Sequence, residues 1–184
     1  MKNSVAILII IIDLASCKRE QKTYPPKVGD QLGGGRVAYI FKQGEPGYVE
    51  GETHGLIAAF AVQARDMEWG CYSTQINGAD RKGVGTGDTN TLEIMNACSS
   101  NEIAARICGN LVENGYDDWY LPSKEELNKL YVFQSDIGGF LRVGAYWSST
   151  QYDSLGAWKQ QFSTGAADYY GKAAKLNVRA VRKF

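Results

Sequence analysis

The sequence contains a single histidine, His54, and four cysteines that form no Cys-x-x-Cys pair. A tetrahedral zinc site therefore lacks ligands at the usual spacing. The 20 basic and 20 acidic residues cancel, so the chain has no basic surplus of the kind that binds nucleic acid. No repeat of any length is visible, and 184 residues suit one domain of ordinary size. We expect no metal, no cofactor and no nucleic-acid partner.

The N-terminus also lacks an apolar run long enough to span a membrane. Lys2 supplies a positive charge and residues 5–12 are apolar, which falls far short of the ~20 residues that a spanning helix needs. This pattern is typical of a secretory signal peptide. We predict that it covers residues 1–16.

The end of this segment, Leu14-Ala15-Ser16-Cys17, resembles the lipobox of bacterial lipoproteins. The resemblance implies cleavage before Cys17, lipidation of Cys17 and attachment to the membrane through that lipid. A plain signal peptide with an incidental cysteine is the alternative. The polar residues 17–30 then form a tether. The expected location is the bacterial cell envelope, at the outer membrane and exposed on the surface.

Three further cysteines remain, and they cannot all pair within one chain. A Cys71–Cys98 bridge is one candidate, but the sequence does not choose among the pairings. Cys108 lies at helical spacing from Ala104 and Leu111, which indicates a buried thiol.

The apolar pattern predicts an α+β fold with short antiparallel sheets, two main helices and long loops. Ser123 and Glu126 form a capping box at the start of one helix, and Gly115 is the expected stop of another. The expected strands cover residues 36–42, 54–61, 146–149, 157–162 and 177–182, and the expected helices cover residues 91–98, 102–113 and 123–132.

Several polar residues invite a catalytic or metal-binding interpretation. The Gly-rich residues 81–88 lack the Gly-Lys-Ser/Thr ending of a phosphate loop, and we expect a loop whose Asp88 or Thr89 caps the next helix. No spacing in the sequence indicates a serine or cysteine nucleophile that would pair with His54, so we expect an ordinary histidine at the end of a strand. Glu45-Pro46-Gly47 lacks the second ligand of a calcium-binding lectin loop, so we predict no calcium site.

Adjacent carboxylates at Asp117 and Asp118 are expected to bind loop backbone rather than to act in catalysis. One of them is also a candidate partner for Arg179 or Arg182, which alternate along an apolar segment and need an anion if buried. If Arg179 has no such partner, we expect its replacement by leucine to cost little.

Three blocks together closely resemble the Lcl C-terminal domain family. They are Gly115-Tyr116-Asp117-Asp118-Trp119-Tyr120-Leu121-Pro122-Ser123-Lys124-Glu125-Glu126-Leu127, Tyr146-Trp147-Ser148-Ser149-Thr150 and Val178-Arg179-Ala180-Val181-Arg182. Gly34-Gly35-Arg36-Val37-Ala38-Tyr39-Ile40 and His54-Gly55-Leu56-Ile57-Ala58-Ala59 fit the N-terminal half of the pattern. The resemblance implies a C-type-lectin-like ligand-binding domain over residues 31–184, in which the first and last strands pair and a long loop region is displayed.

The C-terminal region also resembles the variable proteins of diversity-generating retroelements. In those systems template adenines are copied with errors, so that AAC codons become codons ending in C, which can encode Tyr, Asp, Ser, Leu, Gly and Ala but not Lys. The variable region would cover about residues 147–184, with Trp147, Trp158, Phe162, Val178 and Val181 as scaffold. Lys172 and Lys175 do not fit the permitted set. The expected ligand-binding positions are Tyr152, Asp153, Ser154, Leu155, Gly156, Ala166, Ala167, Asp168, Tyr169, Tyr170, Gly171, Ala173, Ala174 and Leu176.

Tyrosine offers rigid contact area at low entropic cost, and small neighbours leave room for it, so these positions suit a binding surface. If Tyr169-Tyr170 lies on a strand, we expect only one of the two rings to be fully exposed. We predict a non-enzymatic surface lipoprotein that binds an unknown protein or glycan through a retroelement-diversified surface. The alternatives are a fixed-specificity adhesin for host glycan or matrix polysaccharide, with a basic patch from the C-terminal Lys and Arg residues, and an enzyme with an apolar cleft.

Overall fold

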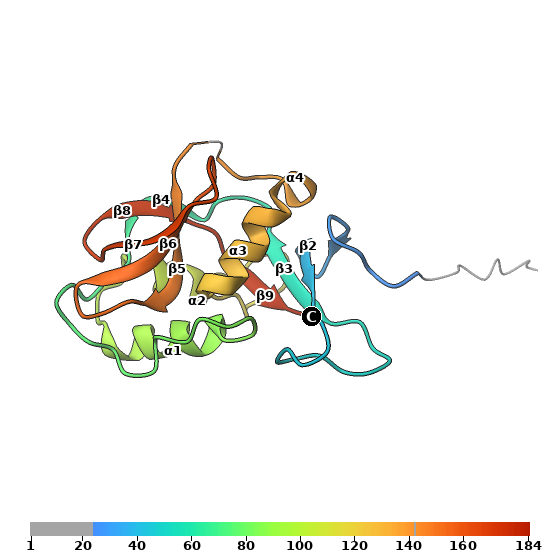
Figure 1. The fold of residues 1–184 in the computed structure, drawn as a ribbon, viewed down its shortest axis with the longest axis horizontal. Coiled ribbons are helices and arrows are strands. Elements are labelled where there is room, and N and C mark those ends of the chain that lie inside the picture. Colours follow the sequence, from blue (N-terminus) through green and yellow to red (C-terminus); the bar gives the residue numbers. More distant parts are fainter. Residues whose placement is uncertain (1–23, 142) are drawn as a thin grey trace, which may run out of the picture.

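The computed structural model describes residues 24–141 and 143–184 (Figure 1). The predicted signal peptide, Cys17 and the first part of the tether lie outside the described residues. The described chain is a mixed α+β structure with two sheets and four helices, as the apolar pattern predicts.

One sheet has four strands in the order β1-β2-β3-β9, and the other has five in the order β4-β8-β5-β6-β7. All strand pairs are antiparallel except β5 and β8, which run parallel. The strands are β1 Gln31–Leu32, β2 Gly35–Ile40, β3 Gly55–Ala59, β4 Ala64–Glu68, β5 Ala145–Gln151, β6 Gly156–Gln161, β7 Ala167–Gly171, β8 Lys175–Val178 and β9 Val181–Lys183.

The helices are α1 Gly87–Ala97, α2 Ala104–Gly109, α3 Lys124–Val132 and α4 Gln134–Ile137. The Ser123 capping box of α3 is present, as expected. The helix predicted over residues 102–113 is shorter, and Gly115 forms a turn at φ +83 rather than a helix stop. The expected side-chain cap of α1 is absent, because the helix begins one residue before Asp88 and follows Thr86, whose side chain makes no cap hydrogen bond.

Two hydrophobic clusters lie on opposite faces of β5, because consecutive strand residues point to opposite sides. Trp147 is fully buried with the α1 and α2 side chains, whereas Tyr146 is fully buried with Leu127 and Leu130 of α3. Tyr146 also packs against Phe162, with ring centroids 4.5 Å apart. The predicted scaffold block therefore joins both cores.

The segment predicted as one strand over residues 177–182 is two strands in different sheets. The chain leaves β8 after Val178 and enters β9 at Val181, and Arg179 and Ala180 make the crossover. β9 pairs with β3, so the expectation that the last strand pairs with the first strand is wrong. The last strand does lie in the same sheet as the first (Figure 1).

Cys71 and Cys98 form a disulfide, and Cys108 is a buried free thiol whose pKa is raised by burial. Both findings agree with the cysteine pattern. A disulfide is typical of proteins that leave the reducing cytosol. Within residues 24–141 and 143–184, no helix has the length and apolarity that crossing a membrane requires.

Candidate functional site

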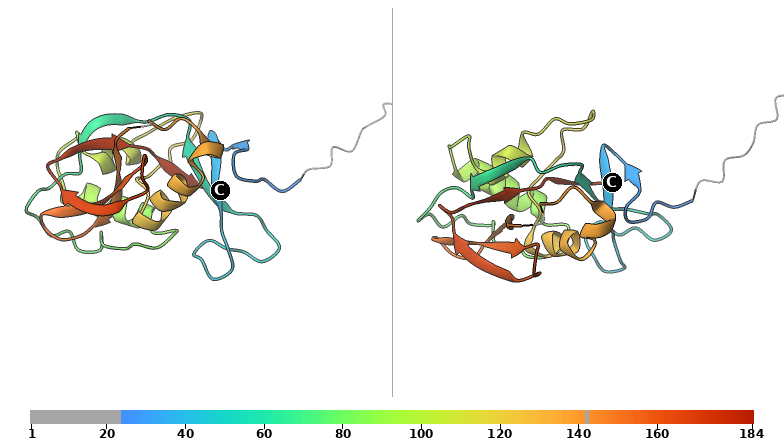
Figure 2. Two further views of the ribbon diagram at one scale, coloured as in Figure 1. Left: turned by 45° about the horizontal axis from the view of Figure 1, so that its top comes forward. Right: turned by 90° about the horizontal axis from the view of Figure 1, so that it is seen from above.

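The fourteen expected binding positions differ from the flanking residues in their exposure to solvent. Ten of them are exposed, three are partly exposed and only Gly156 is buried. By contrast, residues 145–151 and 177–182 are buried throughout. Nine of the exposed positions lie on β7 and on the turns that join β5 to β6 and β7 to β8, at the end of the domain away from the first described residues (Figures 1 and 2). The tenth, Ala166, lies in the turn between β6 and β7.

β7 forms the outer edge of the five-stranded sheet, and all five of its residues are exposed. Tyr169 and Tyr170 point to opposite faces of the strand and are 48% and 54% exposed. The expectation that only one of the two rings would be fully exposed, with the other in the core, is wrong: the two rings are exposed to a similar extent, and all five residues of this edge strand are exposed.

Three aromatic rings from different segments meet on one face of β6 and β7. Tyr152 stacks on Tyr169 with centroids 4.0 Å apart and planes 5° apart. Trp158, which pairs with Tyr169 across the strands, meets both rings edge to face at 5.7 and 6.3 Å. We call Tyr152, Trp158 and Tyr169 the aromatic cluster. Trp158, expected as scaffold, thus belongs to the rim of the candidate surface.

Two lysines border the aromatic cluster. The Lys124 ammonium lies 3.8 Å from the centroid of the Trp158 ring and the Lys82 ammonium lies 5.7 Å from it. On the opposite face, Lys159 lies 5.9 Å from the Tyr170 ring. Sequence reasoning missed Lys82 and Lys124, because they come from the Gly-rich loop and from α3 and no local pattern links them to β7.

Lys172 is fully buried although it sits among exposed residues. Its ammonium donates to Thr74 O and to Gln151 Oε1, both at 2.7 Å, and lies over the Trp69 ring. Burial lowers the Lys172 pKa to about 8. Lys175 is exposed. Lys172, which scrambled AAC codons cannot encode, is therefore a buried residue that anchors the turn after β7.

Three of the C-terminal basic residues are engaged in contacts within the fold. Arg182 donates from Nε and Nη2 to the Asp118 carboxylate at 2.6 and 2.8 Å, which confirms one of the predicted pairings. Arg179 is fully buried and donates to three main-chain carbonyls instead. Lys183 pairs with Asp88 at 2.8 Å. These three cations therefore contribute to holding the fold together.

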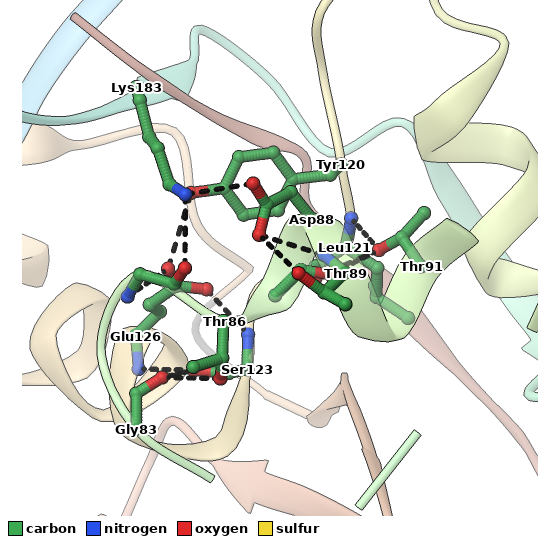
Figure 3. Close-up of polar contacts among 12 residues, drawn as sticks. Gly83, Thr86, Asp88, Thr89, Thr91, Tyr120, Leu121, Ser123, Glu126 and Lys183 are labelled. Atoms are coloured by element: carbon green, nitrogen blue, oxygen red, sulfur yellow. Dashed lines mark hydrogen bonds and ion pairs between the residues drawn. The ribbon is translucent and has the colours of Figure 1, made fainter. Parts of the chain in front are cut away.

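A buried polar network joins the Gly-rich loop, the start of α3 and β9 (Figure 3). The Glu126 carboxylate accepts from Gly85 N at 2.8 Å, from Ser123 N at 2.7 Å and from the Tyr120 hydroxyl at 3.2 Å. Burial raises the Glu126 pKa to about 6, against the lowering effect of these donors. Lys183 completes the network by donating to Gly85 O at 3.0 Å. A raised carboxyl pKa can mark an acid catalyst.

Geometry argues for a structural role of this network. Glu126 is 0% exposed, and three donors already occupy its carboxylate. A cavity of about 210 Å³ lies nearby, and its two carboxylates, Asp88 and Asp118, are paired with Lys183 and Arg182. His54 contacts Glu52 and Phe184 O, with no serine or cysteine among its polar contacts in the described chain. The network fixes the loop that carries Lys82 to the helix that begins with Lys124.

Among known proteins, one family model matches the chain: the Lcl C-terminal domain, over residues 64–182. No curated protein matches the chain.

Proposed function

Because this chain belongs to the Lcl C-terminal domain family, we propose that it is a non-enzymatic bacterial surface protein that binds a ligand through its C-terminal surface. The proposed surface consists of the fourteen positions, which lie on β7, on the adjoining turns and at the start of β6 and of β8, together with Trp158. We also assign the fold to the C-type-lectin-like class. The return of β9 to the N-terminal sheet supports that assignment, since it brings the two ends of the domain together.

The main support for this proposal is that most of the fourteen positions are exposed while the residues that frame them are buried. Ten of the fourteen positions are exposed, while the blocks on either side of them are buried. Exposed substitutions usually change stability by less than ~0.5 kcal/mol. A surface of this kind can therefore change its side chains, and with them its ligand, without unfolding the domain.

We attribute the variation to a diversity-generating retroelement. The ten exposed positions of the fourteen are occupied by residue types that scrambled AAC codons encode. Of the two lysines that such codons do not encode, Lys172 is buried and Lys175 is exposed. Genome sequence tests this attribution: a neighbouring reverse-transcriptase gene and a near-copy of the 3′ end that differs at template adenines are expected. Their absence would refute it and would leave the binding surface itself intact.

The proposed anchor is the lipid on Cys17. The N-terminal described residues and β7 lie at opposite ends of the molecule (Figure 1). A chain tethered through its N-terminus would hold the candidate surface away from the membrane. Labelling cells with radioactive palmitate tests this anchor: the wild-type protein should be labelled and Cys17→Ala should not.

A fixed-specificity adhesin for acidic glycan is the second candidate, and the three lysines beside the aromatic rings favour it. Lys82, Lys124 and Lys159 could meet sulfate or carboxylate groups while Tyr152 and Tyr169 contact sugar rings. Binding of this kind would weaken steeply with salt. Isolates with identical residues at the fourteen positions and strong salt dependence would favour this candidate over the diversified surface.

A further inference from the structure

The outer edge of β7 carries main-chain groups that no strand pairs. β7 is the last strand in the order of the five-stranded sheet, and β6 is its only strand partner among the described residues. All five residues of β7 are exposed. An unpaired edge of this kind is a template for another strand.

The hydrogen-bond pattern shows which groups point outward. In an antiparallel pair, residues alternate between positions that exchange hydrogen bonds with the partner strand and positions that do not. Lys172 N donates to Leu155 O at 2.9 Å, so position 172, and with it positions 170 and 168, face β6. The N–H and C=O groups of Ala167, Tyr169 and Gly171 therefore point away from the sheet.

Two contacts made by outward groups agree with this assignment. Gly171 O accepts from Ala174 N at 2.8 Å in the turn after β7. Tyr169 N–H donates to the carboxylate of its neighbour Asp168 at 2.8 Å. Tyr169 N–H and Gly171 O are thus bonded locally, and within residues 24–141 and 143–184 the other outward main-chain groups of β7 have no strand partner.

The opposite edge of the same sheet is protected far better. β4 carries Arg65, Asp66 and Glu68, and its pairing with β8 is interrupted by a register shift at which Asp66 has φ +52. Charged side chains and bulges are the usual means of preventing edge pairing. On β7, the charged side chain of Asp168 is the single feature of this kind that hinders pairing with another strand.

Charge on both faces of β7 indicates what kind of segment would fit. Lys82 and Lys124 lie beside the aromatic cluster on one face, and Lys159 lies beside Tyr170 on the other. Within the described part of the chain, none of these three lysines forms an ion pair. A strand with acidic side chains pointing to both faces would meet cations on each.

We infer that the outer edge of β7 receives an extended, acidic segment of another polypeptide as an additional strand. This inference rests on the proposed ligand-binding role and specifies its ligand as a polypeptide. The main-chain hydrogen bonds at Ala167, Tyr169 and Gly171 do not depend on side-chain identity, so they persist while the exposed side chains vary. Backbone pairing supplies affinity and the side chains supply selectivity, as in other complexes formed by strand addition.

A library of random linear 12-residue peptides, displayed on phage and selected against the full chain, tests the inference. Acidic binders are expected. Each is then synthesised with N-methyl groups on one or the other set of alternate amides. Only one set faces β7, so one methylated form should lose at least tenfold in affinity and the other should bind nearly as well as the parent. Equal binding by both forms would overturn strand addition.

Variants at the edge give the matching test on the protein. Asp168→Ala frees Tyr169 N–H, whereas Asp168→Asn removes the charge and keeps an acceptor. We expect Ala to bind about fivefold more tightly than Asn, the value of one net hydrogen bond. Ala167→Pro removes an outward donor at the first position of an edge strand, where proline is best tolerated. It should bind at least tenfold more weakly than Ala167→Val, which keeps the N–H.

The remaining outcomes separate this inference from the proposed function. Failure to select any peptide, or dimerisation of the chain through β7, would overturn strand addition. Glycan binding that is lost in Tyr169→Ser but unchanged in Ala167→Pro would overturn it and leave the ligand-binding role standing. Peptide binding that is sensitive to N-methylation but indifferent to every side chain of the surface would support strand addition and contradict the proposed role of the fourteen positions.

Discussion

Replacing Arg179 by leucine should destabilise the protein by about 3 kcal/mol. The side chain donates from Nε to Ala59 O at 2.6 Å, from Nη1 to Gly139 O at 2.7 Å and from Nη2 to Gly138 O at 3.1 Å. Three hydrogen bonds from a charged donor contribute ~4–9 kcal/mol. Burial lowers the Arg179 pKa from 12.5 to about 10. Removing the buried charge therefore recovers ~3 kcal/mol of desolvation free energy, at ~1.4 kcal/mol per pKa unit. The recovered free energy offsets part of the loss of the three hydrogen bonds, and the net loss of stability is about 3 kcal/mol.

Urea unfolding measures the difference, and Lys175→Ala is the matched control, since Lys175 is an exposed basic residue four positions earlier. The control should stay within ~0.5 kcal/mol of the wild type. An Arg179→Leu variant as stable as the control would refute the reasoning. It would also restore the sequence-based expectation that this substitution costs little when no carboxylate faces the arginine.

Three further predictions concern other parts of the frame. The pKa of Glu126 is 4.5 in the unfolded chain and about 6 in the folded chain, so between these pH values the folded state holds more protons than the unfolded state. Glu126 therefore makes the free energy of unfolding fall by ~2 kcal/mol as the pH rises through this range. In pH-dependent urea unfolding, Glu126→Gln should lose that component; an unchanged slope would contradict the burial of this carboxyl. Reducing the Cys71–Cys98 bridge, which spans 27 residues, should cost ~3.5 kcal/mol by loop entropy, and an unchanged melting temperature would count against it. In the same unfolding assay, Lys172→Ala should lower the free energy of unfolding by at least ~2 kcal/mol and Tyr170→Ser by less than ~1 kcal/mol, although both residues lie in one short segment. Equal losses would show that Lys172 is no more an anchor of the fold than the exposed Tyr170.

Features encoded by neighbouring residues were predictable from the sequence. The capping box at Ser123 and Glu126 is local, and the structure contains both of its hydrogen bonds. The Arg182 pairing with Asp118, although distant in sequence, was one of the candidate pairings, because an alternating arginine needs an anion on burial. The Cys71–Cys98 bridge could be named only as a candidate, since pairing depends on the fold rather than on spacing.

Most features that depend on distant contacts were not predictable. β7 lacks apolar alternation because both of its faces are exposed, so no periodic signal marks it as a strand. Residues 177–182 divide between two sheets at Arg179, whose side chain donates to the distant carbonyls of Ala59 and Gly139. Lys82 and Lys124 border the aromatic cluster where the Gly-rich loop is bonded to the start of α3 through Glu126. These relations exist only in the folded chain.

The most direct test of the account exchanges the exposed side chains of the candidate surface in a single variant. The replacements use other residues that scrambled AAC codons encode. Both proteins are unfolded in urea and probed on the same peptide and glycan arrays. The account predicts a free energy of unfolding within ~2 kcal/mol of the wild type and a different set of bound probes. An unfolded variant, or one that binds the same probes as before, would contradict it. The exchanged residues are Tyr152, Asp153, Leu155, Asp168, Tyr169 and Tyr170.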